Sequence, residues 1–84
     1  MPRFHFDIIE GDSILRDEEG QICPDQEAAE AEAIRTVSEM VTHDSGRLVD
    51  FERTVEVRDE SAESLVRVRA VVKLEILRAL SRPP

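Results

Sequence analysis

The sequence predicts an antiparallel α+β domain in which one helix packs on one face of a β-sheet. Three observations predict it: segments in which apolar and polar residues alternate occur in two pairs, one helical segment lies between the pairs, and turn-forming residues separate the segments. The expected order is therefore β-β-α-β-β. The chain has 84 residues, enough for one domain, and we assign residues 1–80 to that domain and 81–84 to a frayed tail.

The first hairpin is predicted in residues 3–17. Its first strand has apolar side chains at every second position, the pattern of a half-buried strand: Phe4, Phe6 and Ile8. A turn rich in Gly and Asp leads to a return strand over 14–17. A second turn ends at Gly20, which can adopt positive φ at no steric cost, and a short extended segment follows at 21–23.

The clearest helix of the sequence spans residues 26–43. Pro24 disfavours helix before it, and the Asp25 carboxylate can accept the unpaired N–H groups of a first helical turn. Within 26–43 there is no Gly or Pro, and Ala and Glu are abundant. At 100° per residue one face collects the apolar side chains Ala29, Ala33, Ile34, Val37, Met40 and Val41. We expect this face to pack on the sheet.

The second hairpin is predicted from residues 51–58 and the alternating segment that ends near residue 72. In the second strand the inward row is Val66, Val68, Ala70 and Val72. Residues 72–80 fit two structures: the alternation can continue through Leu74 and Ile76 as one long strand, or the segment can form a short C-terminal helix. Typical strand length favours a change from strand to helix near residue 72.

Composition and charge exclude several classes of function. The formal net charge of −8 disfavours binding to nucleic acid or to anionic membranes, because both need a basic surface. No segment approaches the roughly 20 apolar residues of a membrane span, and the N-terminus lacks the apolar core of a signal peptide. With Cys23 as the single cysteine, no internal disulfide can form, so we expect a reducing, cytoplasmic location.

No catalytic, cofactor-binding or metal-binding motif is present. The three glycines cannot build a phosphate-binding loop or a Gly-x-Ser-x-Gly elbow, and one Cys with two distant His residues is too few for a zinc site. Cys23 fits a packed apolar residue better than a nucleophile activated by His5 or His43. We therefore expect no enzyme, no cofactor, no metal and no small-molecule substrate. An enzyme remains an option only if His5, Asp7 and Cys23 meet in a cleft.

The residues that we expect to contact a partner lie near the end of the second hairpin. They are three cationic residues and two apolar residues of the segment that follows: Arg67, Arg69, Lys73, Leu74 and Leu77. The cationic row is suited to an acidic partner or a phosphate; the alternative, which we favour, is that it balances cross-strand carboxylates such as Glu52 and Glu56. The expected function is a protein-interaction module that binds another protein or a second copy of itself through an exposed strand edge.

Four sequence blocks together resemble a family of short bacterial proteins, carried mainly by alphaproteobacteria and classed as a domain of unknown function. The blocks are Met1-Pro2-Arg3-Phe4-x-Phe6-Asp7, Asp17-Glu18-Glu19-Gly20, Pro24-Asp25-x-Glu27-Ala28-Ala29 and Val55-x-Val57-Arg58-Asp59-Glu60. The resemblance spans about residues 1–72 and departs at Ala62, where the family often has Gly. It implies no activity and no ligand.

A more distant resemblance, over Cys23 to Ala33, is to antitoxin domains of the HicB type. That resemblance is one of fold. It implies an alternative function, a regulator that masks a basic toxin or RNase with an acidic surface.

Overall fold

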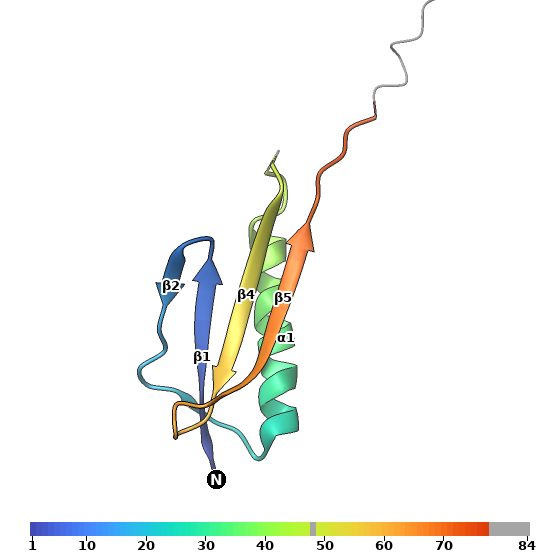
Figure 1. Ribbon diagram of the computed structural model, residues 1–84. Coiled ribbons are helices and arrows are strands. Elements are labelled where there is room, and N and C mark those ends of the chain that lie inside the picture. The colour runs from blue at the N-terminus through green and yellow to red at the C-terminus, as the bar shows by residue number, and fades with distance from the viewer. Residues whose placement is uncertain (48, 78–84) are drawn as a thin grey trace, which may run out of the picture.

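The computed structural model describes residues 1–47 and 49–77, and within them one helix lies against an antiparallel sheet (Figure 1). The elements in chain order are β1 (Arg3–Glu10), β2 (Ser13–Leu15), β3 (Gln21–Ile22), α1 (Gln26–His43), β4 (Phe51–Arg58) and β5 (Ser64–Val72). The strand order is β2-β1-β4-β5, with β3 also paired to β1. The predicted antiparallel α+β fold is confirmed.

The core lies between α1 and the central part of the sheet. In the register of the strands Phe6 faces Val57, and Val55 faces both Ile8 and Val68. These inward rows and the helix enclose the buried apolar residues Phe4, Cys23, Ala29, Ala33, Val37, Val55 and Val57. Figure 1 shows that α1 lies behind β4 and β5, so the helix covers only this part of the sheet.

The start and the packing of α1 follow from its local sequence. The Asp25 side chain accepts a hydrogen bond of 2.8 Å from the Ala28 N–H, as expected of an N-cap. Ala29 and Ala33 are fully buried, and their small side chains let the helix lie close to the sheet. Ile34, predicted in the packed face, is 55% exposed. That prediction was wrong, because 100° of rotation from Ala33 carries Ile34 onto a flank of the helix.

Alternation places Arg53 on the helix side of β4, but the sequence did not predict that this arginine is buried. Arg53 is 8% exposed, and its Nε lies 2.8 Å from a carboxylate oxygen of Asp44, the C-cap residue of α1. Its guanidinium also stacks 4.9 Å from the centre of the Phe51 ring. Arg53 thus closes the core at the C-terminal end of the helix.

The described chain beyond β5 adopts neither of the two predicted structures: β5 ends at Val72, so the strand does not continue through Leu74 and Ile76. Residues 73–77 have no regular secondary structure, and Figure 1 shows them leaving the body of the domain as an extended segment in line with β5. The helix predicted near residues 72–80 is therefore absent from 72–77, while 78–80 and the tail 81–84 lie outside the described residues. A helix this short is marginal in water unless it packs its apolar face on another element.

Candidate functional site

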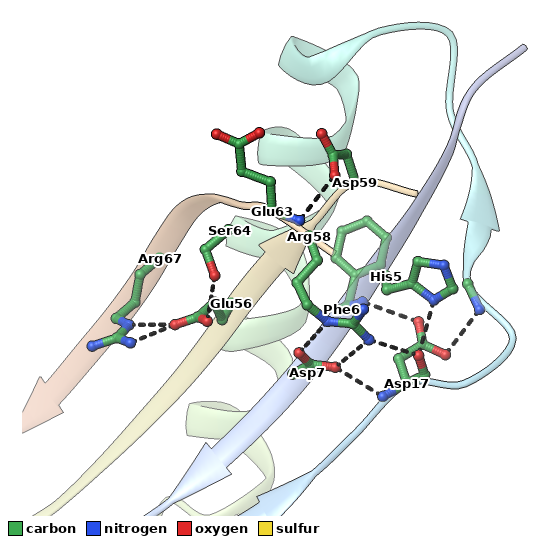
Figure 2. Close-up of polar contacts among 11 residues, drawn as sticks. His5, Phe6, Asp7, Asp17, Glu56, Arg58, Asp59, Glu63, Ser64 and Arg67 are labelled. Carbon is green, nitrogen blue, oxygen red and sulfur yellow. Dashed lines mark hydrogen bonds and ion pairs between the residues drawn. The ribbon is translucent and has the colours of Figure 1, made fainter. Parts of the chain in front are cut away.

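A buried ion pair joins β1 to β4 on the face of the sheet that α1 leaves uncovered. Asp7 and Arg58 are 5% and 8% exposed. The Arg58 Nε donates to one carboxylate oxygen of Asp7 at 2.6 Å, and Nη2 donates to the other at 3.1 Å (Figure 2). This two-point geometry fixes both side chains and ties the two strands together.

Asp17 completes this cluster from the loop between β2 and β3. Its backbone N–H donates to Asp7 at 2.9 Å, and its carboxylate accepts hydrogen bonds from the backbone N–H groups of Phe6 and Gly20, both at 3.0 Å. Its carbonyl oxygen accepts a hydrogen bond from Arg58 and contacts the His5 ring (Figure 2). Asp17 therefore bridges the stretch of β1 between its pairings with β2 and β3.

The electrostatics of the cluster keep it charged. Burial raises the pKa of the Asp7 carboxyl, but hydrogen bonds from Arg58 and the Asp17 backbone outweigh that effect and hold the pKa below its ordinary value. Burial acts on Asp17 in the same way, and the backbone donors Gly20 and Phe6 again lower its pKa. In the described part of the chain, no buried side-chain polar atom lacks a hydrogen-bond partner. The cluster is thus satisfied by the chain itself, as expected of a structural network.

The loop that carries Asp17 packs tightly against β1 at Gly20. Gly20 has a φ of +75°, and a Cβ there would lie 2.9 Å from the Phe4 carbonyl oxygen and from side-chain atoms of Arg3 and His5. The conformation and the space both require glycine. This edge of the sheet is consequently closed by backbone and side chain together.

The predicted cationic row lies on β5, on the same open face. Arg67 forms an ion pair with Glu56, which also accepts a hydrogen bond of 2.7 Å from Ser64 (Figure 2). The hydrogen bonds from Ser64 and Arg67 lower the pKa of the Glu56 carboxyl. Arg69 donates to the Thr54 hydroxyl at 3.3 Å. For Arg67 the cross-strand balance that the sequence left as the alternative is therefore confirmed.

The outer edge of β5 is the other feature of this region. β5 is the last strand in the sheet order, and among residues 1–47 and 49–77 no strand pairs with its outer edge. Side chains on it and on the segment beyond it are exposed: Val71 57%, Leu74 41%, Ile76 55% and Leu77 80%. The five predicted partner contacts therefore lie on one edge strand and its extension. Val71 and Ile76, which are exposed on the same strand and extension, were not among the predicted contacts.

His5 and Asp7 both contact the Asp17 backbone, but Cys23 and His43 lie away from them. Cys23 is buried in the core on the helix side of the sheet, where burial raises the pKa of its thiol. Asp7 belongs to the ion pair on the opposite face, and His43 is exposed at the end of α1. Among the described residues, no group of three or more His, Cys, Asp or Glu side chains is placed to hold a metal ion. No helix in that part of the chain is long and apolar enough to cross a membrane.

One hollow lies beside the closed edge. It has a volume of about 520 Å³ and is lined by Phe6, Ile8 and Leu15, together with the loop 16–21. The helix-side faces of β1 and β2 form its apolar floor. It is open to solvent and contains none of the five predicted partner contacts.

Fold and surface together define a small two-layer α+β domain with one closed and one open sheet edge. The chain belongs to the family described as Domain of unknown function (DUF6894), whose match covers residues 3–71. That match confirms the resemblance to a domain of unknown function, and it ends before the exposed segment 73–77. No curated protein and no solved structure matches the chain significantly.

Proposed function

We propose that this chain is a non-enzymatic protein-interaction module that binds its partner along the outer edge of β5 and the segment 73–77. The proposal rests on the observation that the edge strand β5 and the segment 73–77 are continuous. A nine-residue edge strand runs directly into an extended segment whose apolar side chains are exposed. Unpaired strand edges bind extended segments of other chains through backbone hydrogen bonds, and exposed apolar side chains add affinity.

The orientation of the backbone along β5 supports this use of the edge. The Leu74 N–H donates to the Asp50 side chain at 2.7 Å, on the β4 side. Because backbone groups point to alternate sides along a strand, the N–H and C=O groups of Arg69, Val71 and Lys73 point to the outer edge. These groups are available to a partner strand without any change in the β4–β5 pairing.

The polar cluster supports a non-enzymatic role. Both carboxylate oxygens of Asp7 and of Asp17 accept hydrogen bonds from groups of the same chain. A general acid or base instead needs an oxygen or nitrogen that can reach a substrate. We place the module in the cytoplasm, since its single cysteine, Cys23, is a buried thiol.

The test is affinity capture from the native cell with the full chain as bait. Val71→Pro removes an outward N–H while the β4–β5 hydrogen bonds remain, and truncation after Val72 removes the apolar segment. We expect both to lose the proteins that the full chain captures, whereas Glu27→Gln, on the exposed side of α1, retains them. Capture that is identical with all baits would contradict the proposed surface.

A second candidate is the antitoxin-type regulator that masks a basic toxin or RNase. The observation that favours it is an acidic end of the sheet. Arg3 hydrogen-bonds both the Glu19 carbonyl and the Glu60 side chain, which brings two loops together there. The exposed carboxylates of this end are Glu18, Glu19, Glu60 and Glu63. Co-expression with a small basic protein encoded by a neighbouring gene tests it, and failure to co-purify from every such pair would exclude it.

A further inference from the structure

The side chains beyond β5 continue the pattern of the strand itself. On the helix side the row Val68, Ala70 and Val72 continues with Leu74 and Ile76. On the open face the row Arg67, Arg69 and Val71 continues with Lys73, Glu75 and Leu77. Residues 73–77 therefore have the composition of a half-buried strand, although no strand lies beside them within the described chain.

A second copy of the chain can supply that neighbour only in certain registers. Two copies of β5 related by a two-fold axis pair antiparallel, so the residue at the centre faces itself and its neighbours face each other in reverse order. Centring on Val68 puts Arg67 against Arg69 of the other copy. Centring on Ala70 puts Arg67 against Lys73. Each of these arrangements places like charges directly opposite, which destabilises a sheet.

The remaining registers differ in the charges that they place opposite each other. Centring on Arg69 puts that residue against itself. Centring on Val71 puts Arg69 against Lys73 and Arg67 against Glu75, so two like-charge pairs offset two attractive pairs. Centring on Val72 instead puts Arg69 against Glu75, an attractive pair that occurs twice by symmetry. Registers centred outside residues 68–72 pair a shorter stretch of the described residues, which end at 77. Among the described residues, the register centred on Val72 is thus the longest in which no like charges face each other.

We propose that the partner of this edge is a second copy of the chain, paired antiparallel through residues 67–77 with the two-fold axis at Val72. This inference rests on the proposed function and names the partner. In this register odd-numbered residues face odd-numbered residues, and these are the residues whose backbone groups point outward. The N–H and C=O groups of Arg69 therefore meet those of Glu75 and can form hydrogen bonds.

The same register buries the exposed apolar residues. Leu74 lies beside Ala70 of the other copy, and Ile76 beside its Val68, both on the helix side of the joint sheet. Thr36 and Met40 of α1 line a hollow with Glu10 of β1, so their side of the helix faces β1. Ile34, which is 55% exposed, lies on the other flank of α1, toward β5. The segment from the second copy would therefore cover Ile34. Each copy thereby extends the core of the other.

Disulfide trapping in the full chain tests the register, with Cys23→Ala as background. Residues that face each other without hydrogen bonds lie about 4.5 Å apart at Cα, within the range that a disulfide spans. We expect Val72→Cys to form a covalent dimer of twice the 9.5 kDa chain mass. Ala70→Cys and Leu74→Cys form none singly, but when mixed they form a dimer that contains one of each. Trapping by Ala70→Cys alone would overturn the register.

Charge exchange with light scattering tests the association without a covalent bond. Glu75→Arg places Arg against Arg69 twice, and we expect dimerisation about tenfold weaker, since each pair contributes up to roughly 1 kcal/mol. Arg69→Glu combined with Glu75→Arg restores the attraction and the dimer. A chain that is monomeric at every concentration, with no trapping at position 72, overturns this inference. The proposed function then still stands if Val71→Pro abolishes capture of a different protein.

Discussion

The sheet ends differently on its β1 side and on its β5 side. At β1 two short strands, β2 and β3, flank a loop whose Asp17 carboxylate satisfies the Phe6 N–H, and the buried Asp7–Arg58 pair holds the loop in place. At β5 a nine-residue strand is followed by exposed apolar residues. Proteins usually protect long strand edges against association, and this contrast is the basis of our proposal that the β5 edge, and not the β1 side, contacts another chain.

The largest loss of stability is expected when the buried ion pair on the β1 side of the sheet is broken. Arg58→Ala leaves the buried Asp7 carboxylate without its partner, and we expect a loss of about 3–5 kcal/mol in the free energy of unfolding, measured by urea denaturation. The control is Arg67→Ala on the open-edge strand, where the ion-pair side chain is 53% exposed and the expected loss is within about 1 kcal/mol. Equal losses would mean that the two edges do not differ in this way.

Protonation weakens the same cluster more gradually. The folded-state pKa values of Asp7 and Asp17 lie below the ordinary 3.8. Their stabilising contribution is therefore complete above that value and is lost as the pH falls through the lowered folded pKa values. We expect Tm to fall as the pH is lowered from about 5 toward about 2, and to fall less steeply in Asp17→Asn. Asp12→Asn, in the exposed β1–β2 turn, serves as control, and the prediction fails if Asp17→Asn keeps the full acid slope.

A smaller effect is expected where the loop touches β1. Gly20→Ala introduces a Cβ 2.9 Å from the Phe4 carbonyl oxygen at a φ of +75°, and we expect a loss of about 2 kcal/mol or slightly more. Gly11→Ala is the matched control, because its φ is +59° but nothing lies within 4 Å of the added Cβ. It should cost only the backbone strain, about 1 kcal/mol. Thermal unfolding of both variants measures the difference, and equal losses would contradict the close contact.

The smallest effect lies in the turn that leads into the open-edge strand. Ala62 has a φ of 66°, a conformation that costs a non-glycine residue about 1–2 kcal/mol. Ala62→Gly removes that strain but loses roughly 0.5–1 kcal/mol to the greater entropy of the unfolded chain, so we expect a net gain of about 0.5 kcal/mol in thermal unfolding. Ser61→Gly in the same turn gains nothing, and a loss in Ala62→Gly would contradict the strain.

The parts of this protein that were predictable from sequence are those with a local cause. The helix over 26–43 and its Asp25 cap were predicted within their observed bounds, because capping and helical periodicity act over a few residues. The return strand expected at 14–17 and the extended segment expected at 21–23 are shorter, at Ser13–Leu15 and Gln21–Ile22. Between these two short strands the Asp17 side chain, and not a strand, accepts the hydrogen bond of the Phe6 N–H. A pattern of neighbouring residues does not reveal such a contact.

Alternation alone also determined which side chains of β1, β4 and β5 lie on the helix side of the sheet, since successive residues in a strand point to opposite faces. Tertiary structure decided two things that no local pattern contains: that Asp7, Asp17 and Arg58 meet, and that β5 is left with an open edge. Both depend on which strands pair and in what register. Pairing joins residues as far apart in sequence as Asp7 and Arg58, whose contact exists only once the whole sheet has formed.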